Sequence, residues 1–244
     1  MKVLVMTLTH NNADILPFFL RHYSTFADEI WAWDDGSTDG TRMLLSENPK
    51  TRVFDWPHHT GIDEDQFLLH WQAEYPKARG EFDWVMVVDS DEFIFHPIID
   101  WILLRELAVG TEVIETEGFN MIGDGLPKDD GRQIWELSQL GVSSPTYSKP
   151  VVFRPEININ WIRGRHAVEH CDPVFSSEPF LKLLHYRYMG ADYTRAKNAK
   201  NYARCGLLSG DKGAAWSCSP NYTGEHSAQW SEEAKRKSFN VIQI

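Results

Sequence analysis

The chain begins with the stretch KVLVMTLTHNN, residues 2–12, in which an apolar run leads directly into polar residues. Residues 2–9 lack the polar alternation of a strand with one solvated face, so we predict a strand buried on both faces, which is typical of a parallel sheet. Asn11, Asn12 and Asp14 are residue types that begin helices, and we predict a helix after them. A strand followed by a helix is the first half of an α/β unit.

The same alternation recurs up to residue 93. Strands are predicted at 29–33, 51–56 and 84–88, with helices at 41–47 and 63–79 between them. Repeated strand–helix units of this kind predict a doubly wound α/β arrangement with right-handed crossovers.

Beyond residue 110 loops replace most of the helices. Strands are predicted at 112–119, 149–154, 157–163 and 179–186, followed by a helix at 191–207. The expected fold class is therefore α/β, with a mostly parallel sheet in the first half and a mixed or antiparallel second half.

The composition restricts the partners and the location of the protein. Lys and Arg total 24 against 35 Asp and Glu, which gives a net charge of −11 and a pI of about 5.3. An acidic surface disfavours nucleic acids and anionic membranes as partners. No apolar run approaches the roughly 18 residues of a membrane-spanning helix, and no signal peptide is recognisable. We expect a cytoplasmic protein without a transmembrane segment, and leave peripheral attachment to a membrane open.

Polar, turn-forming residues follow three of the predicted strands, at 9–11, 34–39 and 89–92. The carboxyl ends of parallel strands meet at one edge of the sheet, where open α/β folds bind their ligands. Asp89 and Asp91 are two positions apart after a strand, so their carboxylates point the same way and can bind one divalent cation. Oxygen ligands favour Mn²⁺ or Mg²⁺ over zinc, and such a cation would neutralise a diphosphate leaving group.

Three segments stand out along the first half of the chain: THNNADILP (9–17), DDGSTDGT (34–41) and VVDSDEF (87–93). They resemble glycosyltransferases of the GT-A fold, with the small family-2-like bacterial and viral enzymes as the nearest subgroup. Weaker similarity continues through YSKP (147–150) and LLHY (183–186), so the resemblance covers about residues 2–205. Asn12 departs from the pattern, because that subgroup usually has Glu at this position.

The resemblance implies a nucleotide site at the ends of the first strands. Thr9 and Asn11 would line the pocket for the base, and Asp34 and Asp35 would hold the base or the ribose. Asp89 would contact the ribose on the side of the sugar. Carboxylates suit these roles because they accept strong hydrogen bonds from hydroxyl and imide groups.

The resemblance also implies a metal and diphosphate site next to the ribose. Asp89 and Asp91 would bind the metal, with His185 as a further ligand and His166 as a candidate for metal or diphosphate contact. Lys149 and Arg165 are candidates for phosphate contact.

Transfer with inversion of configuration requires a general base to deprotonate the acceptor hydroxyl. Asp124, between two glycines after a predicted strand, and Glu169 are the two candidates. Retention of configuration requires no such base, and both outcomes remain open.

These observations predict a metal-dependent glycosyltransferase that uses a nucleoside diphosphate sugar, preferably linked to UDP. The acceptor would be a hydroxyl of a glycan, a lipid-linked molecule or a protein. We expect one domain over residues 1–244, with a nucleotide-binding half at 1–95, an acceptor and metal half at 96–208 and a polar segment at 209–244. Two alternatives are a nucleotidyltransferase acting on sugar phosphates, and a nucleotide-binding module without catalytic activity.

Overall fold

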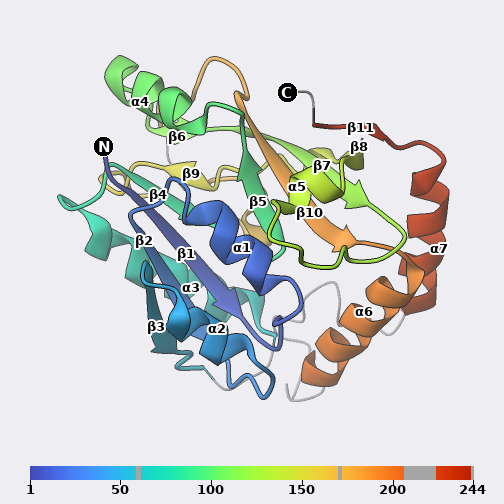
Figure 1. Cartoon of the computed structure of the whole chain (residues 1–244). Coiled ribbons are helices and arrows are strands. Elements are labelled where there is room, and N and C mark those ends of the chain that lie inside the picture. The colour runs from blue at the N-terminus through green and yellow to red at the C-terminus, as the bar shows by residue number, and fades with distance from the viewer. Residues whose placement is uncertain (59–61, 170–171, 206–223, 243–244) are drawn as a thin grey trace.

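Two β-sheets form the core of the computed structural model, which describes residues 1–58, 62–169, 172–205 and 224–242 (Figure 1). In order across the main sheet, its strands are β3 (Thr51–Asp55), β2 (Glu29–Asp34), β1 (Val3–Thr9), β4 (Trp84–Val87), β9 (Val152–Phe153) and β6 (Val113–Ile114). Strands β1 to β4 are parallel, and β9 is antiparallel to both of its neighbours.

The second sheet is mixed. Its strands, in order, are β11 (Phe239–Asn240), β8 (Leu140–Ser143), β7 (Thr116–Ile122), β10 (Leu181–Tyr188) and β5 (Glu92–Phe95). Strands β7 and β10 are parallel, and the other pairs are antiparallel. The expected α/β fold class, with a mostly parallel first half and a mixed second half, is confirmed.

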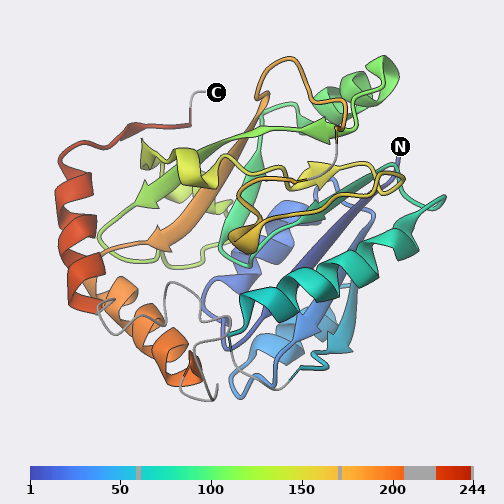
Figure 2. The ribbon, with the colours of Figure 1, turned by 180° about the vertical axis from the view of Figure 1, so that it is seen from behind.

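Both faces of the main sheet are covered, as the apolar run of β1 predicts. Val3 and Val5 pack into a core shared with helices α1 (Leu16–Tyr23) and α2 (Thr41–Glu47) and with the second sheet, whereas Leu4 and Met6 face α3 (Glu64–Glu74). Figures 1 and 2 show α1 and α2 on one face of the sheet and α3 on the other.

Helix α1 also holds the start of the second sheet. The Tyr23 hydroxyl donates to the Glu92 carbonyl oxygen (2.9 Å) and accepts from the Ile94 backbone N–H (3.0 Å). His22 Nε2 lies 2.9 Å from the Ile94 carbonyl oxygen and donates to it. These contacts fix the position of β5, the strand that follows the Asp89–Asp91 pair.

Several sequence predictions agree with the structure and others do not. The four parallel strands, the helix at 41–47 and the strand at 179–186 are confirmed. The helix predicted at 63–79 is α3 followed by a 3₁₀ turn (Tyr75–Ala78), and the helix at 191–207 is α6 (Ala191–Cys205) as far as the described residues reach. The strand predicted at 112–119 is interrupted at Glu115, because β6 pairs in the main sheet and β7 pairs in the second sheet.

The predicted strand at 157–163 is wrong. In the described part of the chain this segment joins neither sheet: residues 160–162 pair with residues 167–169 through a single bridge, Trp161 to Val168, and Arg79 donates to the Ile157 carbonyl oxygen.

Several elements were not predicted from the sequence. They are β5, α4 (Ile99–Val109), α5 (Ile134–Leu137), β8, α7 (Gly224–Lys235) and β11. Of the polar segment at 209–244, residues 209–223 and 243–244 lie outside the described residues.

None of the described helices combines the length and the apolar character needed to span a membrane.

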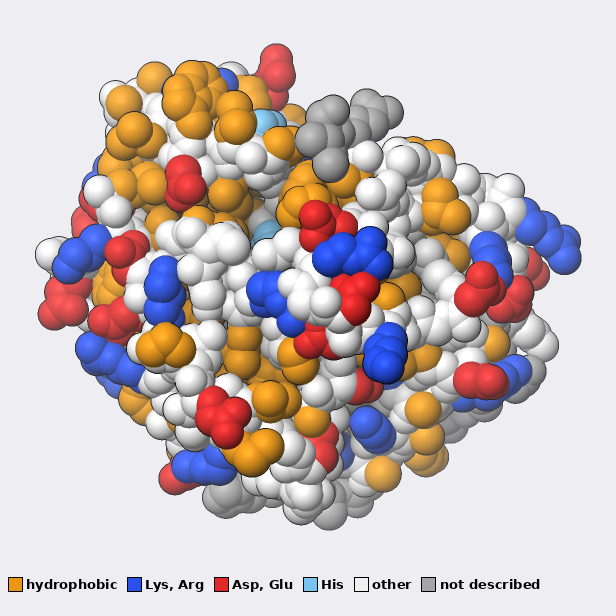
Figure 3. Space-filling view, viewed as in Figure 1, with side chains coloured by type: hydrophobic (Ala, Val, Ile, Leu, Met, Phe, Trp, Pro, Cys, Tyr) orange, Lys and Arg blue, Asp and Glu red, His pale blue; other side chains and the backbone are white. Residues whose placement is uncertain are grey.

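Exposed apolar side chains gather on α4. Ile98, just before the helix, and Trp101 and Leu104 within it are each 54% exposed. Figure 3 shows an apolar area at the upper left, over α4, whereas charged side chains of both signs cover more of the remaining face. The helix lies toward the amino ends of the parallel strands, away from the polar loops at their carboxyl ends (Figure 1).

The buried His22 predicts a pH-dependent stability. Burial lowers its pKa from 6.5 to about 4, although its hydrogen bond to the Ile94 carbonyl opposes this shift. As the pH falls from 6.5 to about 4, the unfolded chain binds a proton that the folded chain does not, and the free energy of unfolding falls by up to about 1.4 kcal/mol per pH unit. Urea unfolding at several pH values in this range gives the slope of the free energy of unfolding against pH. His22→Gln should reduce this slope by the equivalent of about one bound proton, and an unchanged slope would contradict the assignment.

Candidate functional site

A cavity of about 260 Å³ opens at the carboxyl ends of β1 and β4. Its walls come from the loops after these two strands, from α3, from residues 147–149 and 164–166, from β10 and from α6. The charged side chains that line it are Glu64, Asp89, Asp91, Lys149, Arg165, Arg187, Lys197 and Arg204. Leu8, Ile62, Phe67 and Trp71 form an apolar part of the wall. The cavity therefore combines both charge signs with an apolar surface.

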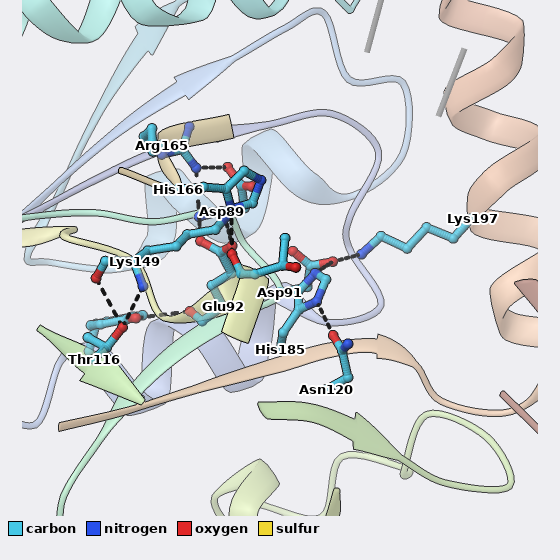
Figure 4. Close-up of polar contacts among 12 residues, drawn as sticks. Asp89, Asp91, Glu92, Thr116, Asn120, Lys149, Arg165, His166, His185 and Lys197 are labelled. Carbon is cyan, nitrogen blue, oxygen red and sulfur yellow. Dashed lines mark hydrogen bonds and ion pairs between the residues drawn. The ribbon is translucent and has the colours of Figure 1, made fainter. Parts of the chain in front are cut away.

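A buried ionic network supports one side of the cavity (Figure 4). Glu92 is fully buried, and its carboxylate accepts from Lys149 Nζ at 2.5 Å and from the Asp89 backbone N–H at 3.1 Å. Arg165 Nη2 donates to Asp89 Oδ1 at 2.8 Å and lies 3.9 Å from Glu92 Oε2. Lys149 and Arg165 are 3% and 4% exposed, so both cations are buried and paired with carboxylates of this network.

The backbone at residues 164–165 aims Arg165 into this network. Gly164 has a φ of 72°, and a Cβ there would lie 2.4 Å from His166 Nε2, so a glycine is required. Arg165 has a φ of 59°, a conformation that costs a residue with a side chain on the order of 1–3 kcal/mol. The ion pair between its guanidinium and the Asp89 carboxylate offsets this cost.

Asp91 faces the other side of the cavity. Its carboxylate pairs with Lys197 of α6 and lies 3.6 Å from His185 Nε2 on β10. The other ring nitrogen of His185, Nδ1, lies 2.9 Å from Asn120 Oδ1, and the ring stacks on Tyr147 with centroids 4.0 Å apart. Figure 4 shows Lys197 reaching from its helix towards Asp91, between α6 and β10.

Both aspartates stay ionised in this environment. Burial by itself would raise the pKa of Asp89, but the charges of Arg165 and Lys149 outweigh it and lower the pKa. Burial opposes the charged form of Asp91 as well, and Lys197 and His185 hold its pKa well below the usual range. Burial by itself would lower the pKa of Lys197, but Asp91 and Tyr193 together outweigh it and raise the pKa. The pair is therefore fully charged near neutral pH.

Asn12, the departure from the family pattern, joins the first loop to the loop of the aspartates. Its side-chain N–H group donates to Ser90 Oγ at 2.8 Å and to Thr9 Oγ1 at 3.2 Å. A glutamate at this position could donate neither bond while ionised. Asn12 thus positions Ser90 between the two aspartates.

Seven of the predicted site residues meet in this cavity. They are Thr9, Asp89, Asp91, Lys149, Arg165, His166 and His185. His166 Nδ1 lies 2.5 Å from the Thr146 carbonyl oxygen, and burial, followed by the charge of Lys149, lowers the pKa of its ring.

Three other predicted residues lie at or just beyond the carboxyl ends of β1 and β2, beside the cavity and not in its wall. Asn11 has a φ of 51°, and its Oδ1 accepts from the backbone N–H groups of Thr38 and Asp39, so it organises the loop after β2. Asp34 is buried and accepts from Arg42 at 3.3 Å. Asp35 pairs with Arg204 of α6, whose side chain does line the cavity.

The two candidate bases lie outside the cavity wall. Asp124 is exposed and pairs with Lys235 of α7. Glu169 is exposed, and its backbone N–H donates to the Asn160 carbonyl oxygen at 2.8 Å. Neither carboxylate lines the cavity that holds the two aspartates.

The sequence analysis missed several lining residues. Glu64 and Trp71 belong to α3. The spacing of apolar residues in this helix predicts that one face packs in the core, but nothing in the sequence indicates that the helix also lines the cavity. The sequence does show a basic face on the helix at 191–207, with Arg195, Lys197, Lys200 and Arg204, but not that Lys197 and Arg204 line this cavity.

Asp91 and His185 provide two converging ligand atoms for a divalent cation. Their facing atoms, Oδ2 and Nε2, are 3.6 Å apart, and the contact of Nδ1 with Asn120 Oδ1 keeps Nε2 directed toward Asp91. Within the described residues no group of three His, Cys, Asp or Glu side chains converges to hold a metal. Two protein ligands suit Mg²⁺ or Mn²⁺ if water and substrate oxygens complete the coordination shell. In the structure as described, the Asp91 carboxylate is paired with Lys197.

The Glu92 network predicts a strong coupling in stability. Lys149→Met leaves a buried carboxylate without its closest cation and should lower the free energy of unfolding by about 3–5 kcal/mol. In the double variant with Glu92→Gln part of this loss should return, and a double-mutant cycle by urea unfolding measures the coupling. Arg132→Gln, in an exposed pair with Asp130, is the control and should leave the urea midpoint unchanged. Simple additivity of the two core variants would contradict the network.

No protein-family model matches the chain. Two curated proteins, both uncharacterised, match it with 33% identity over 103 residues, one from Mycobacterium tuberculosis and one from Mycobacterium bovis. The match covers 37% of this chain and 23% of each relative, so the chain spans less than a quarter of their length.

Among solved structures, the chain is similar to S. aureus TarS, a glycosyltransferase, with 19% identity and a TM-score of 0.41 over 64% of this chain and 28% of that one. A second TarS structure gives 15% identity and a TM-score of 0.47 over 82% and 65%. A mycobacterial protein gives 23% and 0.35 over 49% and 40%. Similarities at this level assign the chain to no family, and its function has to be argued from the site.

Proposed function

We propose that the protein is a glycosyltransferase that moves a sugar from a nucleoside diphosphate, preferably UDP, to an acceptor hydroxyl. One observation carries the proposal: Asp89 and Asp91 line a cavity at the carboxyl ends of parallel strands, side by side with several cationic side chains. A site for a sugar nucleotide needs carboxylates for hydroxyl groups and a cation, and positive charge for the diphosphate.

The lining of the cavity suits the parts of such a donor. Phe67, Trp71 and Thr9 all line it and offer an apolar surface and a hydroxyl for a nucleobase. Asp89 is held by Arg165 and is 49% exposed, so its second oxygen is accessible to a ribose hydroxyl. The diphosphate and the sugar would then extend toward Asp91 and His185.

A divalent cation, Mn²⁺ or Mg²⁺, is part of the proposal. Asp91 and His185 would hold it, and it would supply positive charge to the departing diphosphate. The contact between His185 Nδ1 and Asn120 Oδ1 keeps the imidazole ring oriented for this role.

The reaction breaks the bond between the anomeric carbon and the diphosphate oxygen and forms a bond from the anomeric carbon to the acceptor oxygen. If the configuration is inverted, a base accepts the proton of the acceptor hydroxyl.

Asp124 and Glu169 do not line the described cavity, whereas Glu64 does. Burial raises the pKa of Glu64, although Arg165 opposes this shift, and a raised pKa makes a carboxylate a better proton acceptor. We therefore add Glu64 to the candidate bases. The acceptor would be a glycan, a lipid-linked molecule or a protein.

Nucleotide binding tests the donor class. UDP with Mn²⁺ should raise the melting temperature by several degrees, since a ligand at about 100 times its Kd adds about 2.7 kcal/mol, whereas GDP and CDP should raise it less. EDTA or Asp91→Asn should reduce the shift, and Asp100→Asn, on exposed α4, serves as the control. If no nucleotide shifts the melting temperature, the proposal is wrong.

Hydrolysis of UDP-sugars in the absence of an acceptor tests the chemistry. A glycosyltransferase releases UDP and free sugar slowly, a nucleotidyltransferase cleaves between the phosphates, and a binding module leaves the donor intact. Glu64→Gln should slow an inverting reaction by about 10²–10⁴-fold with unchanged UDP affinity. Asp124→Asn and Glu169→Gln, assayed in parallel, identify the base if the loss occurs there instead.

A further inference from the structure

Helix α6 lies across the carboxyl ends of three adjacent parallel strands. Lys197 pairs with Asp91 after β4, Lys200 Nζ donates to the Asn11 carbonyl oxygen after β1 at 3.3 Å, and Arg204 pairs with Asp35 after β2. Strand β1 lies between β4 and β2 in the main sheet. The three cations of one helix face thus follow the order of the strands.

The dimensions of helix and sheet explain this match. Lys197 and Arg204 are seven residues apart, a rise of about 10.5 Å along a helix. Strands β4 and β2, with one strand between them, are about 10 Å apart. One helix face can therefore reach both strand ends without distortion, and Figure 1 shows α6 beside the ends of these strands.

Lys197 differs from two of the other cations in the cavity. Lys149 and Arg165 are locked to the buried Glu92 and to Asp89. Lys197 reaches the site through a long side chain that is 13% exposed, and its partner Asp91 is 8% exposed. A lysine ammonium on a flexible stem can change partners more readily than a cation enclosed in a network.

We propose that Lys197 binds the diphosphate of the donor by exchanging Asp91 for a phosphate oxygen, while Arg204 and Lys200 keep α6 across the strand ends. The inference rests on the proposed function, since it assigns a ligand to the same cavity. A donor brings more negative charge to the ammonium than one carboxylate does, and Asp91 is released for other ligands. Lys197 is thus a donor-binding residue supplied by the second half of the chain.

A series of ligands with no, one and two phosphate groups tests this assignment. Kd values for uridine, UMP and UDP are measured by calorimetry, in EDTA and in Mn²⁺, on the full chain. Lys197→Gln should weaken UDP binding by ~10- to 100-fold, as expected for loss of a charge-assisted bond, and leave uridine binding nearly unchanged. Lys197→Arg should recover most of the UDP affinity. Arg195→Gln removes a charge from the same helix at a side chain paired with Asp192, and should match the wild type.

The outcomes separate the two proposals. If the wild type binds neither uridine nor UDP, the proposed function fails and this inference fails with it. If the wild type binds UDP and Lys197→Gln binds it equally well, or loses uridine and UDP binding to the same degree, then Lys197 only supports the structure and the inference is overturned. Circular dichroism and melting curves of each variant confirm that a loss of binding is not a loss of folding.

Discussion

The buried carboxylate of Glu92 is the constraint on which the site depends. It lies at the first residue of β5, bonded to Lys149 and to the backbone of Asp89, while its carbonyl oxygen accepts from Tyr23 of α1. A carboxylate without exposure is stable only with close cations and hydrogen bonds. Satisfying Glu92 therefore fixes the turn that carries both aspartates, the segment that carries Lys149 and the helix that covers them.

Successive described strands change sheet five times, and three of these connections are short segments close to the site. Residues 88–91 connect β4 to β5, Glu115 separates β6 from β7, and residues 144–151 lead from β8 to β9. Thr116 and Lys149 join two of these crossings, because the Thr116 hydroxyl donates to the Lys149 carbonyl oxygen and accepts from its backbone N–H, both at 3.0 Å. Backbone that leaves a sheet turns its side chains toward the gap between the sheets, and Asp89, Asp91 and Lys149 all lie on such segments.

The cavity wall carries more cationic than anionic side chains, although the protein as a whole is acidic. The net charge is −11, yet the cavity wall contains five Lys or Arg side chains against three carboxylates. Two of these cations, Lys197 and Arg204, come from a helix more than a hundred residues after Asp91 and Asp35. A locally positive site in a negative surface favours an anionic small molecule over a polyanion, because the wider field repels an extended chain of phosphates.

The sequence by itself determined the parallel half of the fold and the edge at which the site lies. The apolar run of residues 2–9 requires a strand covered on both faces, and polar residues after each parallel strand have to meet at one edge. This is why Asp89, Asp91 and Thr9 could be placed together without a structure. Local signals of this kind depend only on side-chain periodicity and on the geometry of parallel strands.

Only the tertiary structure decided which distant residues complete the site. Glu92 looks like the continuation of an acidic turn, yet packing of the second sheet buries it completely and makes Lys149 its partner. Asp124 and Glu169 have the sequence features of candidate bases, but their loops place them outside the cavity, whereas α6 reaches across the strand ends with Lys197. Contacts across such sequence separations depend on how the two sheets and α6 pack, and no local pattern encodes that packing.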